Sequence, residues 1–228
     1  MKKIAKHLSI AGFVVSAVIS AQATAQTAAP AAAPEPTPEH TLVPKISLYS
    51  EYEYRGIGQT SEKPALQFNL DYSHSSGFYL GLFATNIKWL KDYKDLGAAQ
   101  DSAAIEVDLF GGYKFEVAKD VIVDVGYLRY EYPGSKPLPG NAKFATDEVY
   151  VGVAYGPVSA KYSYSTGDTF GVANAKGTTF IELNFAKEIM PKLTLNAQVG
   201  QQKYKGSIGS FNNDKELTYT VTRSARPM

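Results

Sequence analysis

The chain has 228 residues, of which 23 are basic and 22 acidic; it has 16 Tyr, 11 Phe, a single Trp and no cysteine. Three of the basic residues are Lys2, Lys3 and Lys6, and without them 20 basic residues stand against 22 acidic ones, a net charge of about −2. This balance excludes a nucleic-acid binder, which needs clustered positive charge. The lack of cysteine excludes disulfides, thiol nucleophiles and zinc sites built on sulfur.

The N-terminal segment predicts export from the cytoplasm. An apolar run from Ile10 to Ile19 follows the lysines, and a small-residue "ATA" ends at Ala25. This is the pattern of a signal peptide, here residues 1–25, with cleavage between Ala25 and Gln26. The apolar run of about ten residues is too short for a membrane-spanning helix, which needs about 20.

The rest of the chain divides into a linker, a strand-rich region and a tail. Residues 26–43 are rich in Ala and Pro, which predicts a disordered linker. From residue 44 to residue 222 apolar and polar residues alternate, as expected for strands with one oily and one polar face. Residues 223–228 show no such pattern. The predicted strands cover 46–54, 65–74, 78–87, 104–115, 121–132, 148–155, 158–165, 181–186, 193–200 and, as a shorter tenth candidate, 216–222.

The connections between these strands alternate strictly between short and long. Short ones are expected at 75–77, 116–120, 156–157 and 187–192, and long ones at 56–63, 88–102, 133–146, 166–177 and 203–215. Outer-membrane barrels have this arrangement, with short periplasmic turns and long external loops. The stretch "DYSHSSGFYLG" then contains a short turn on the periplasmic side.

The composition of the two faces favours a membrane barrel over a soluble β-sandwich, the alternative for an alternating pattern. The polar face carries mostly Gly, Ser, Thr, Asn and Gln, whereas a sandwich would place charged residues there. Arg129 interrupts an apolar face, so we expect it at a rim or beyond a β-bulge. Aromatic residues near strand ends resemble the girdles of such barrels: Tyr52, Tyr54, Tyr72, Tyr113, Tyr127, Tyr155, Tyr162, Tyr164 and Phe185. The fold class is therefore all-β, a transmembrane antiparallel up-and-down β-barrel with about 10 strands in this chain, closed because lipid tolerates no open sheet edge.

Residues 49–89 contain "YRGIGQT" after the first predicted strand, "PALQ" at the start of the second, "DYSHSSGFYLG" across the first turn and N-x-x-W from Asn86 to Trp89. Together with "YLRYEYPG" at residues 127–134, these motifs resemble the TorF-like porin family of proteobacteria. The resemblance implies an outer-membrane barrel of about 12 strands assigned to passive transport, which ends on an aromatic residue read by the barrel assembly machinery. This chain ends on Met228 after a basic tail, from which we expect a truncation or frameshift near Thr220.

The sequence gives only weak signals for a catalytic site or a metal site. His74 lies among serines near Asp71, but the two residues are expected on opposite faces of a strand, so they cannot form a catalytic relay. "RGIGQTS" has two glycines and no following helix, which indicates a tight turn and not a dinucleotide loop. The other histidines, His7 and His40, fall in the signal peptide and the linker, so we expect no histidine cluster, no metal site and no cofactor. Asp92 and Asp95 are expected in a solvated external loop, with binding of divalent cations as the alternative.

The inner face carries the candidate functional residues. Eight acids and three bases are predicted to line the lumen: Glu51, Glu53, Arg55, Asp71, Glu106, Asp108, Lys114, Asp124, Glu148, Lys161 and Glu182. Rings of carboxylates favour cations in a pore. The alternative is that these charges pair with one another and fill a narrow interior.

These observations predict a porin of the outer membrane that lets small solutes or ions diffuse passively and is not an enzyme. Its expected partners are outer-membrane lipid, the barrel assembly machinery and the solutes themselves, with no nucleic acid. Two alternatives remain, a non-conducting barrel with structural or adhesive loops and a barrel-borne lipid hydrolase that uses His74.

Overall fold

The computed structural model describes residues 38–97, 99–191 and 193–206, and the backbone of residues 215–225. The predicted signal peptide and most of the predicted linker lie outside the described residues. Ten strands pair in chain order into one antiparallel sheet, the up-and-down meander that the sequence predicts. They are β1 (His40–Tyr49), β4 (Ala65–His74), β5 (Phe78–Asn86), β7 (Ile105–Ala118), β8 (Val121–Glu131), β10 (Thr146–Tyr155), β11 (Val158–Ser165), β12 (Thr179–Met190), β13 (Leu193–Lys203) and β14 (Lys215–Ala225).

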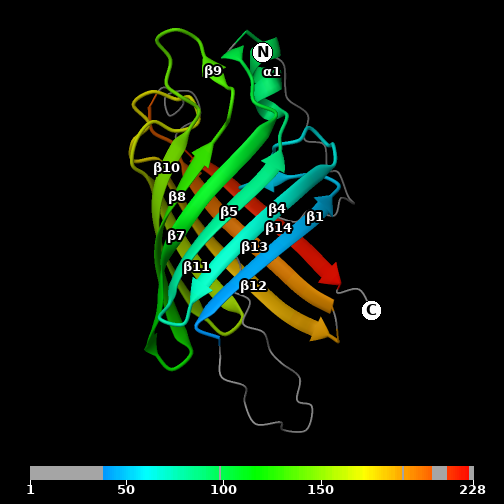
Figure 1. Cartoon of the computed structure of the whole chain (residues 1–228), viewed down its shortest axis with the longest axis vertical. Helices are drawn as coiled ribbons and strands as arrows, with labels where there is room; N and C mark the ends of the chain where they lie inside the picture. Colours follow the sequence, from blue (N-terminus) through cyan, green and yellow to red (C-terminus); the bar gives the residue numbers. More distant parts are fainter. Residues whose placement is uncertain (1–37, 98, 192, 207–214, 226–228) are drawn as a thin grey trace.

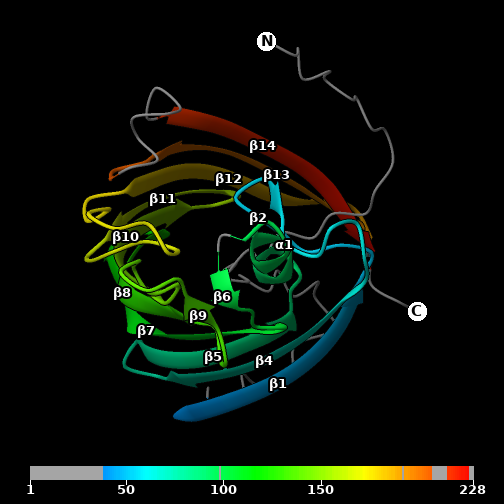
Figure 2. The same ribbon diagram turned by 90° about the horizontal axis from the view of Figure 1, so that it is seen from above.

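The sheet is strongly curved. Its strands run obliquely side by side in Figure 1, and from above they bend around a central axis (Figure 2). Among the described pairings β1 joins β4 alone and β14 joins β13 alone, so these two strands form the edges of the sheet. The structure therefore contains an all-β antiparallel sheet with an inner and an outer face.

Short and long connections alternate as predicted, but β7 and β12 extend to Ala118 and Met190, into the short connections expected at 116–120 and 187–192. Residues 75–77, 119–120 and 156–157 make tight turns at one end, where Gly77, Asp120 and Gly156 have positive φ angles of 104°, 61° and 54°. The long connections at the other end carry the remaining elements: β2 (Glu53–Tyr54), β3 (Ile57–Gly58), α1 (Trp89–Asp95), β6 (Ala99–Asp101) and β9 (Lys136–Pro137). Seen from above, α1, β2 and β6 lie within the curve of the sheet (Figure 2).

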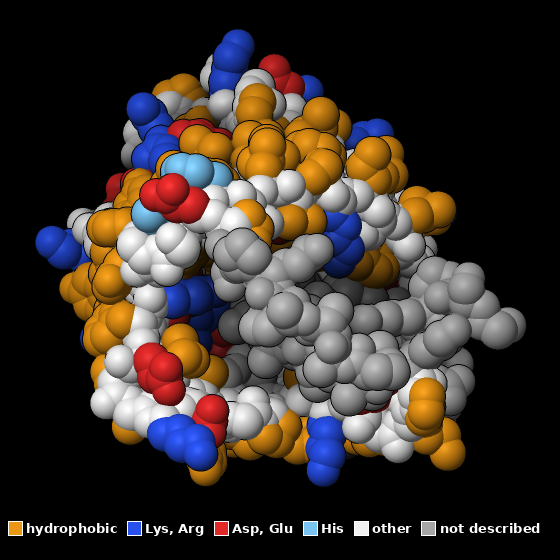
Figure 3. All heavy atoms as spheres, turned by 60° about the horizontal axis from the view of Figure 1, so that its bottom comes forward, with side chains coloured by type: hydrophobic (Ala, Val, Ile, Leu, Met, Phe, Trp, Pro, Cys, Tyr) orange, Lys and Arg blue, Asp and Glu red, His pale blue; other side chains and the backbone are white. Residues whose placement is uncertain are grey.

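The two faces of the sheet differ as the alternation predicts. Outward-facing side chains are apolar and exposed, among them Leu48, Leu66, Leu80, Leu109, Val125, Val149, Val151, Tyr162, Ile181 and Leu183. On the face shown in Figure 3, hydrophobic side chains gather at the surface among polar and charged ones. Inward-facing side chains include buried polar and charged groups, among them Gln67, Thr85, Glu106, Asp108, Glu148, Ser163, Glu182 and Gln202. This is the reverse of the burial found in a water-soluble β-sandwich.

Both ends of the sheet differ from the predicted boundaries. β1 begins at His40, inside the predicted linker, and ends at Tyr49, so the expected strand 46–54 is wrong over its second half. The chain leaves the sheet there and folds inward as the β2–β3 hairpin. β14 runs to Ala225, three residues into the segment that was expected to be irregular. The predicted loop 88–102 contains α1, and no helix among the described residues is long and apolar enough to cross a membrane.

Arg129 lies near the end of β8, the rim position that was expected. Its guanidinium Nη1 is 2.9 Å from Asp147 Oδ1, and its Nε donates to Glu131 Oε1 at 2.6 Å. The Tyr127 hydroxyl also donates to Asp147. These polar contacts satisfy the one basic side chain on this otherwise apolar stretch of the outer face.

Candidate functional site

Arg55 reaches the inner face of the sheet from a tight turn. Glu53 pairs with Gly58 and Tyr54 with Ile57, so Arg55 and Gly56 form a two-residue hairpin loop. Both have positive φ angles, 49° and 78°, as a type I′ turn requires. The "RGIG" segment is thus the tight turn that the sequence predicts, and it directs an arginine into the interior.

Arg55 makes a bidentate ion pair with Glu148 of β10. Nη1 donates to Oε1 at 3.0 Å and Nη2 to Oε2 at 2.7 Å, and Nη1 also donates to Gln202 of β13 at 3.1 Å. The side chains of Arg55 and Glu148 are only 9% and 2% exposed. A parallel pair of charge-assisted hydrogen bonds fixes both position and orientation of the guanidinium. The ion pair therefore holds the β2–β3 hairpin against the opposite wall of the sheet.

Aromatic rings surround this ion pair. The Arg55 Cζ lies 4.4 Å from the Phe180 ring centroid and 4.7 Å from that of Tyr54, distances typical of cation–π contacts. The Tyr54 hydroxyl donates to the Tyr130 hydroxyl at 2.9 Å. The guanidinium is therefore surrounded by aromatic ring faces and a carboxylate in place of water.

Two further carboxylates lie beside this cluster on β7. Glu106 accepts a 2.9 Å hydrogen bond from the Tyr52 hydroxyl. Asp108, two residues along on the same face, is buried, and its Oδ1 is one of the buried side-chain atoms without a hydrogen-bond partner among the described residues. Burying carboxylates together is unfavourable unless a proton or a cation offsets their charge. Asp108 Oδ1 is therefore a buried carboxylate oxygen that a proton or a cation would have to satisfy.

A second polar network lies toward the end with the short turns. Lys114 Nζ is 4.0 Å from Asp124 Oδ2, and the Tyr79 hydroxyl donates to Asp124 Oδ1 at 2.6 Å. On the neighbouring strands Lys161 Nζ is 2.8 Å from Glu182 Oε1. Each of the three predicted inward bases thus pairs with a predicted inward acid. The alternative of mutually neutralised charges is correct for these three pairs.

The other predicted acids have different surroundings. Asp71 is exposed on β4. Glu51 Oε1 accepts a 3.2 Å hydrogen bond from the Glu62 backbone N–H, and Glu53 is partly buried in the hairpin. Burial, and secondarily the nearby Glu51 carboxylate, raise the pKa of Glu53. None of the described ion pairs involves Glu51, Glu53, Asp71, Glu106 or Asp108, so carboxylates remain in excess on the inner side.

The end with the long connections is filled by side chains from the loops. Leu90 of α1 is completely buried, and Trp89 packs edge-on against Tyr132 and Phe144 with ring centroids 5.3 and 5.9 Å apart. The Ser61 hydroxyl donates to Asp92 Oδ2 at 2.7 Å, joining the loop before β4 to α1. This hydrogen bond, helped by Lys88, lowers the pKa of Asp92. Side chains of the long connections therefore pack together at this end of the sheet.

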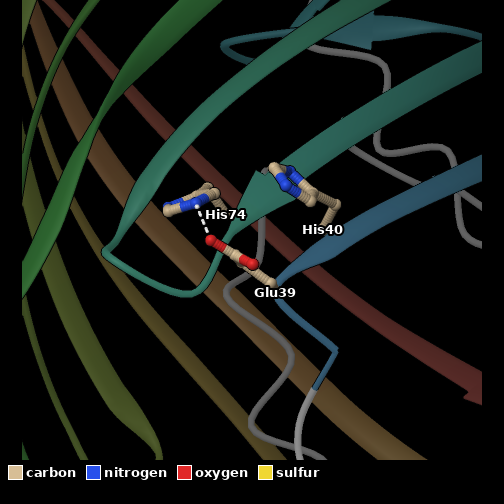
Figure 4. A group of neighbouring side chains, drawn as sticks. All are labelled: Glu39, His40 and His74. Atoms are coloured by element: carbon tan, nitrogen blue, oxygen red, sulfur yellow. Dashed lines mark ion pairs between the residues drawn. The ribbon is translucent and has the colours of Figure 1, made fainter.

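His74 has partners other than those of a catalytic relay with Asp71. Its Nδ1 lies 2.6 Å from Ser76 Oγ and its Nε2 lies 3.4 Å from Glu39 Oε1 (Figure 4). The prediction that no histidine cluster forms is wrong, because β1 starts early enough to place His40 directly across from His74. The His7 of that prediction lies outside the described residues.

A model of a family described as a bacterial protein of unknown function (Gcw_chp) matches residues 33–220. The chain belongs to this family. No curated protein and no solved structure matches it. The Gcw_chp match includes every strand from β1 to β13, and with them the inner polar face and the histidine pair.

Sequence reasoning missed several interior residues of this Gcw_chp chain. Tyr52 and Tyr54 were expected in an outer aromatic girdle, but Tyr52 is 2% exposed and bonds Glu106 inside the sheet. Tyr130 and Gln202, which contact the Arg55 cluster, had not been singled out. The only signal for them was their position in the alternation of each strand, which places both on the inner face.

Proposed function

We propose that this chain is an exported outer-membrane β-barrel that lets small solutes or ions diffuse passively and prefers cations. The observation that carries the proposal is the reversed burial of the sheet. Val149 is 43% exposed on the outer face while its neighbour Glu148 is 2% exposed on the inner one. In water such rows of exposed apolar side chains are unfavourable, by about 25 cal/mol per Å² of apolar surface. Against acyl chains they are favourable.

Four features support a membrane setting. The first residues read as a signal peptide, and the motifs resemble the TorF-like porin family. The outer apolar rows extend over the strands from β1 to β13, and the alternation of short and long connections matches outer-membrane barrels. In this proposal the edges β1 and β14 are closed in the membrane, because hydrocarbon cannot satisfy unpaired backbone groups. The barrel assembly machinery would insert the chain.

The cation preference rests on the excess of inward carboxylates. Lys114, Lys161 and Arg55 are each neutralised by one acid, and Asp108 keeps a buried oxygen without a partner. An ionised carboxylate in a low-dielectric passage attracts cations and repels anions, so the preference holds for the inward carboxylates that are not protonated. Because α1 and the β2–β3 hairpin fill the mouth, the passage in this state is narrow, and we expect low conductance.

The test begins with the full chain expressed in a Gram-negative outer membrane. A folded barrel migrates differently on a gel before and after boiling, and this shift is the expected result. The purified protein is then placed in a planar bilayer with a salt gradient, where the reversal potential reports selectivity. We expect a cation-selective potential that Asp108→Asn reduces, while Asp95→Asn, an exposed acid of α1, leaves it unchanged.

The outcomes separate the parts of the proposal. A water-soluble product without a gel shift would overturn the barrel. A gel shift without any conductance would leave a barrel that does not conduct, and would favour adhesive or structural loops. Anion selectivity would refute the role given to the carboxylates.

A further inference from the structure

Two histidines face each other across the first pair of strands. His40, the first residue of β1, is the Cα partner of His74, the last residue of β4, and their ring centroids lie 5.0 Å apart. Glu39 immediately precedes β1 and points its carboxylate at His74 (Figure 4). Three side chains of metal-ligating type therefore meet at the edge of the sheet, at the end with the short turns.

The donor atoms have the spacing of a metal site. His74 Nε2 and Glu39 Oε1 are 3.4 Å apart, and one donor atom from each of the three residues lies within 4.8 Å of the others. Two ligands on a tetrahedral zinc at about 2.0–2.1 Å are separated by roughly 3.3 Å. The His74–Glu39 separation already fits, and rotation of the exposed side chains would bring the wider pairs to the same distance.

The remaining ring nitrogens have partners that orient the imidazoles. His74 Nδ1 lies 2.6 Å from Ser76 Oγ, and His40 Nδ1 lies 2.9 Å from the Tyr72 hydroxyl. The Tyr72 hydroxyl can accept a proton from His40 Nδ1, which leaves the His40 Nε2 lone pair for a metal. His74 Nδ1 also accepts a 3.1 Å hydrogen bond from the Ser76 backbone N–H, so metal binding at His74 Nε2 requires the ring proton to move to Nδ1, where Ser76 Oγ can accept it. Histidine ligands typically donate their second ring N–H in this way, which fixes the tautomer and the ring plane.

The site is open to solvent on one side. The side chains of Glu39 and His74 are 72% and 27% exposed, and histidine side chains are visible at the surface beside acidic ones (Figure 3). Two neutral imidazoles and one carboxylate carry a charge of −1, which suits a divalent ion, and imidazole favours zinc and its late transition-metal neighbours over magnesium or calcium. Water would fill the fourth position.

We propose that Glu39, His40 and His74 bind a zinc-type transition-metal ion that fastens the start of β1 to the end of β4. Because β1 has only one partner strand among the described pairings, a metal joining the two strands adds a link at its N-terminal end and stabilises it there. The proposal stands on this cluster alone and does not depend on conduction.

The test uses the full chain, folded in detergent and produced without a histidine tag. Titration with Zn²⁺ by calorimetry should give one site per chain, and Co²⁺ in its place should give the visible absorption of a tetrahedral complex. His40→Ala, His74→Ala and Glu39→Gln should each weaken Zn²⁺ binding at least tenfold. His7→Ala and Glu62→Gln, which remove a histidine and an exposed acid elsewhere in the chain, should leave it unchanged.

A second readout separates binding from folding. Zn²⁺ should raise the melting temperature of the wild-type chain but not that of His74→Ala, whose circular dichroism should match the wild type because the side chain lies at a surface turn. Zn²⁺ binding that survives both histidine substitutions, or that is lost with His7→Ala, would overturn the proposal. So would a wild-type chain that binds no Zn²⁺.

Discussion

Glu148 and Val149 are neighbours in β10, yet the charged residue is 2% exposed and the apolar one 43% exposed. Glu148 faces the interior, where Arg55 binds its carboxylate. Val149 faces outward beside its two Cα partners, Tyr127 on β8 and Tyr164 on β11. One residue of register shift would exchange the two environments, so the pattern fixes the register of the strand strongly.

The outer face gives the first prediction. Val151 lies at the middle of β10 and is 47% exposed beside Val125 and Tyr162, whereas Tyr155 ends the strand. If the outer face meets lipid, Val151→Arg should destabilise the folded state by about 2–4 kcal/mol and Tyr155→Arg by about 0–1 kcal/mol, because the cost of a charge falls toward the interface. Urea unfolding in lipid vesicles measures both. Equal costs at the two positions would contradict a lipid-facing surface.

The Arg55–Glu148 ion pair gives the second prediction. Arg55→Met keeps the stem of the side chain but leaves the Glu148 carboxylate buried without its cation. Removing one partner of a buried pair costs about 3–5 kcal/mol, whereas replacing both partners costs much less. We therefore expect Arg55→Met to lower the free energy of unfolding by that amount, and the double variant with Glu148→Gln to recover most of it.

Limited proteolysis provides a separate readout for the same pair. Because Arg55 joins the β2–β3 hairpin to β10, the single variant should be cleaved within residues 50–64 sooner than the wild type. Unchanged cleavage and unchanged stability would show that the aromatic contacts hold the hairpin without the ion pair.

Local sequence predicted the strands and their faces, because a period of two specifies both within a few residues. It could not predict where the first strand ends. Tyr52 and Tyr54 continue the alternation of Ile46 and Leu48, so the pattern alone extends the strand to residue 54. What directs the chain inward is an ion pair between Arg55 and a residue 93 positions away.

The pairing of the inward charges also depended on register. Lys161 and Glu182 are direct Cα partners on β11 and β12, as are Lys114 and Asp124 on β7 and β8. The alternation of side chains along each strand placed all four on the inner face. Only the register between neighbouring strands brings each base opposite its acid. The histidine pair was missed for a different reason, because the Ala/Pro-rich composition before His40 predicted a linker where β1 begins.

The contact between Ser61 and Asp92 gives the third prediction. The Ser61 hydroxyl, with Lys88, stabilises the ionised carboxylate, which lowers the pKa of Asp92. Ser61→Ala should therefore raise the pKa of Asp92 toward its ordinary value, as measured by NMR titration. Because a lowered folded-state pKa contributes stability above the unfolded pKa and loses it as pH falls, the loop should detach from α1 on acidification. An unchanged pKa in the variant would show that the loop is not docked there in solution.

Two glycines of the inner face give the last prediction. A Cβ added at Gly112 would lie 2.4 Å from the Val125 backbone oxygen and 2.5 Å from the Tyr79 hydroxyl, whereas at Gly152 the nearest atom, Ala160 O, is 3.4 Å away. Gly112→Ala should therefore cost about 1–3 kcal/mol through overpacking against a backbone that cannot yield. Gly152→Ala should be neutral or stabilise by up to about 1 kcal/mol, because alanine loses less chain entropy on folding. Fluorescence of Trp89, the single tryptophan, follows unfolding in both variants. Equal effects at the two glycines would mean that β7 and β8 do not approach as closely as their register requires.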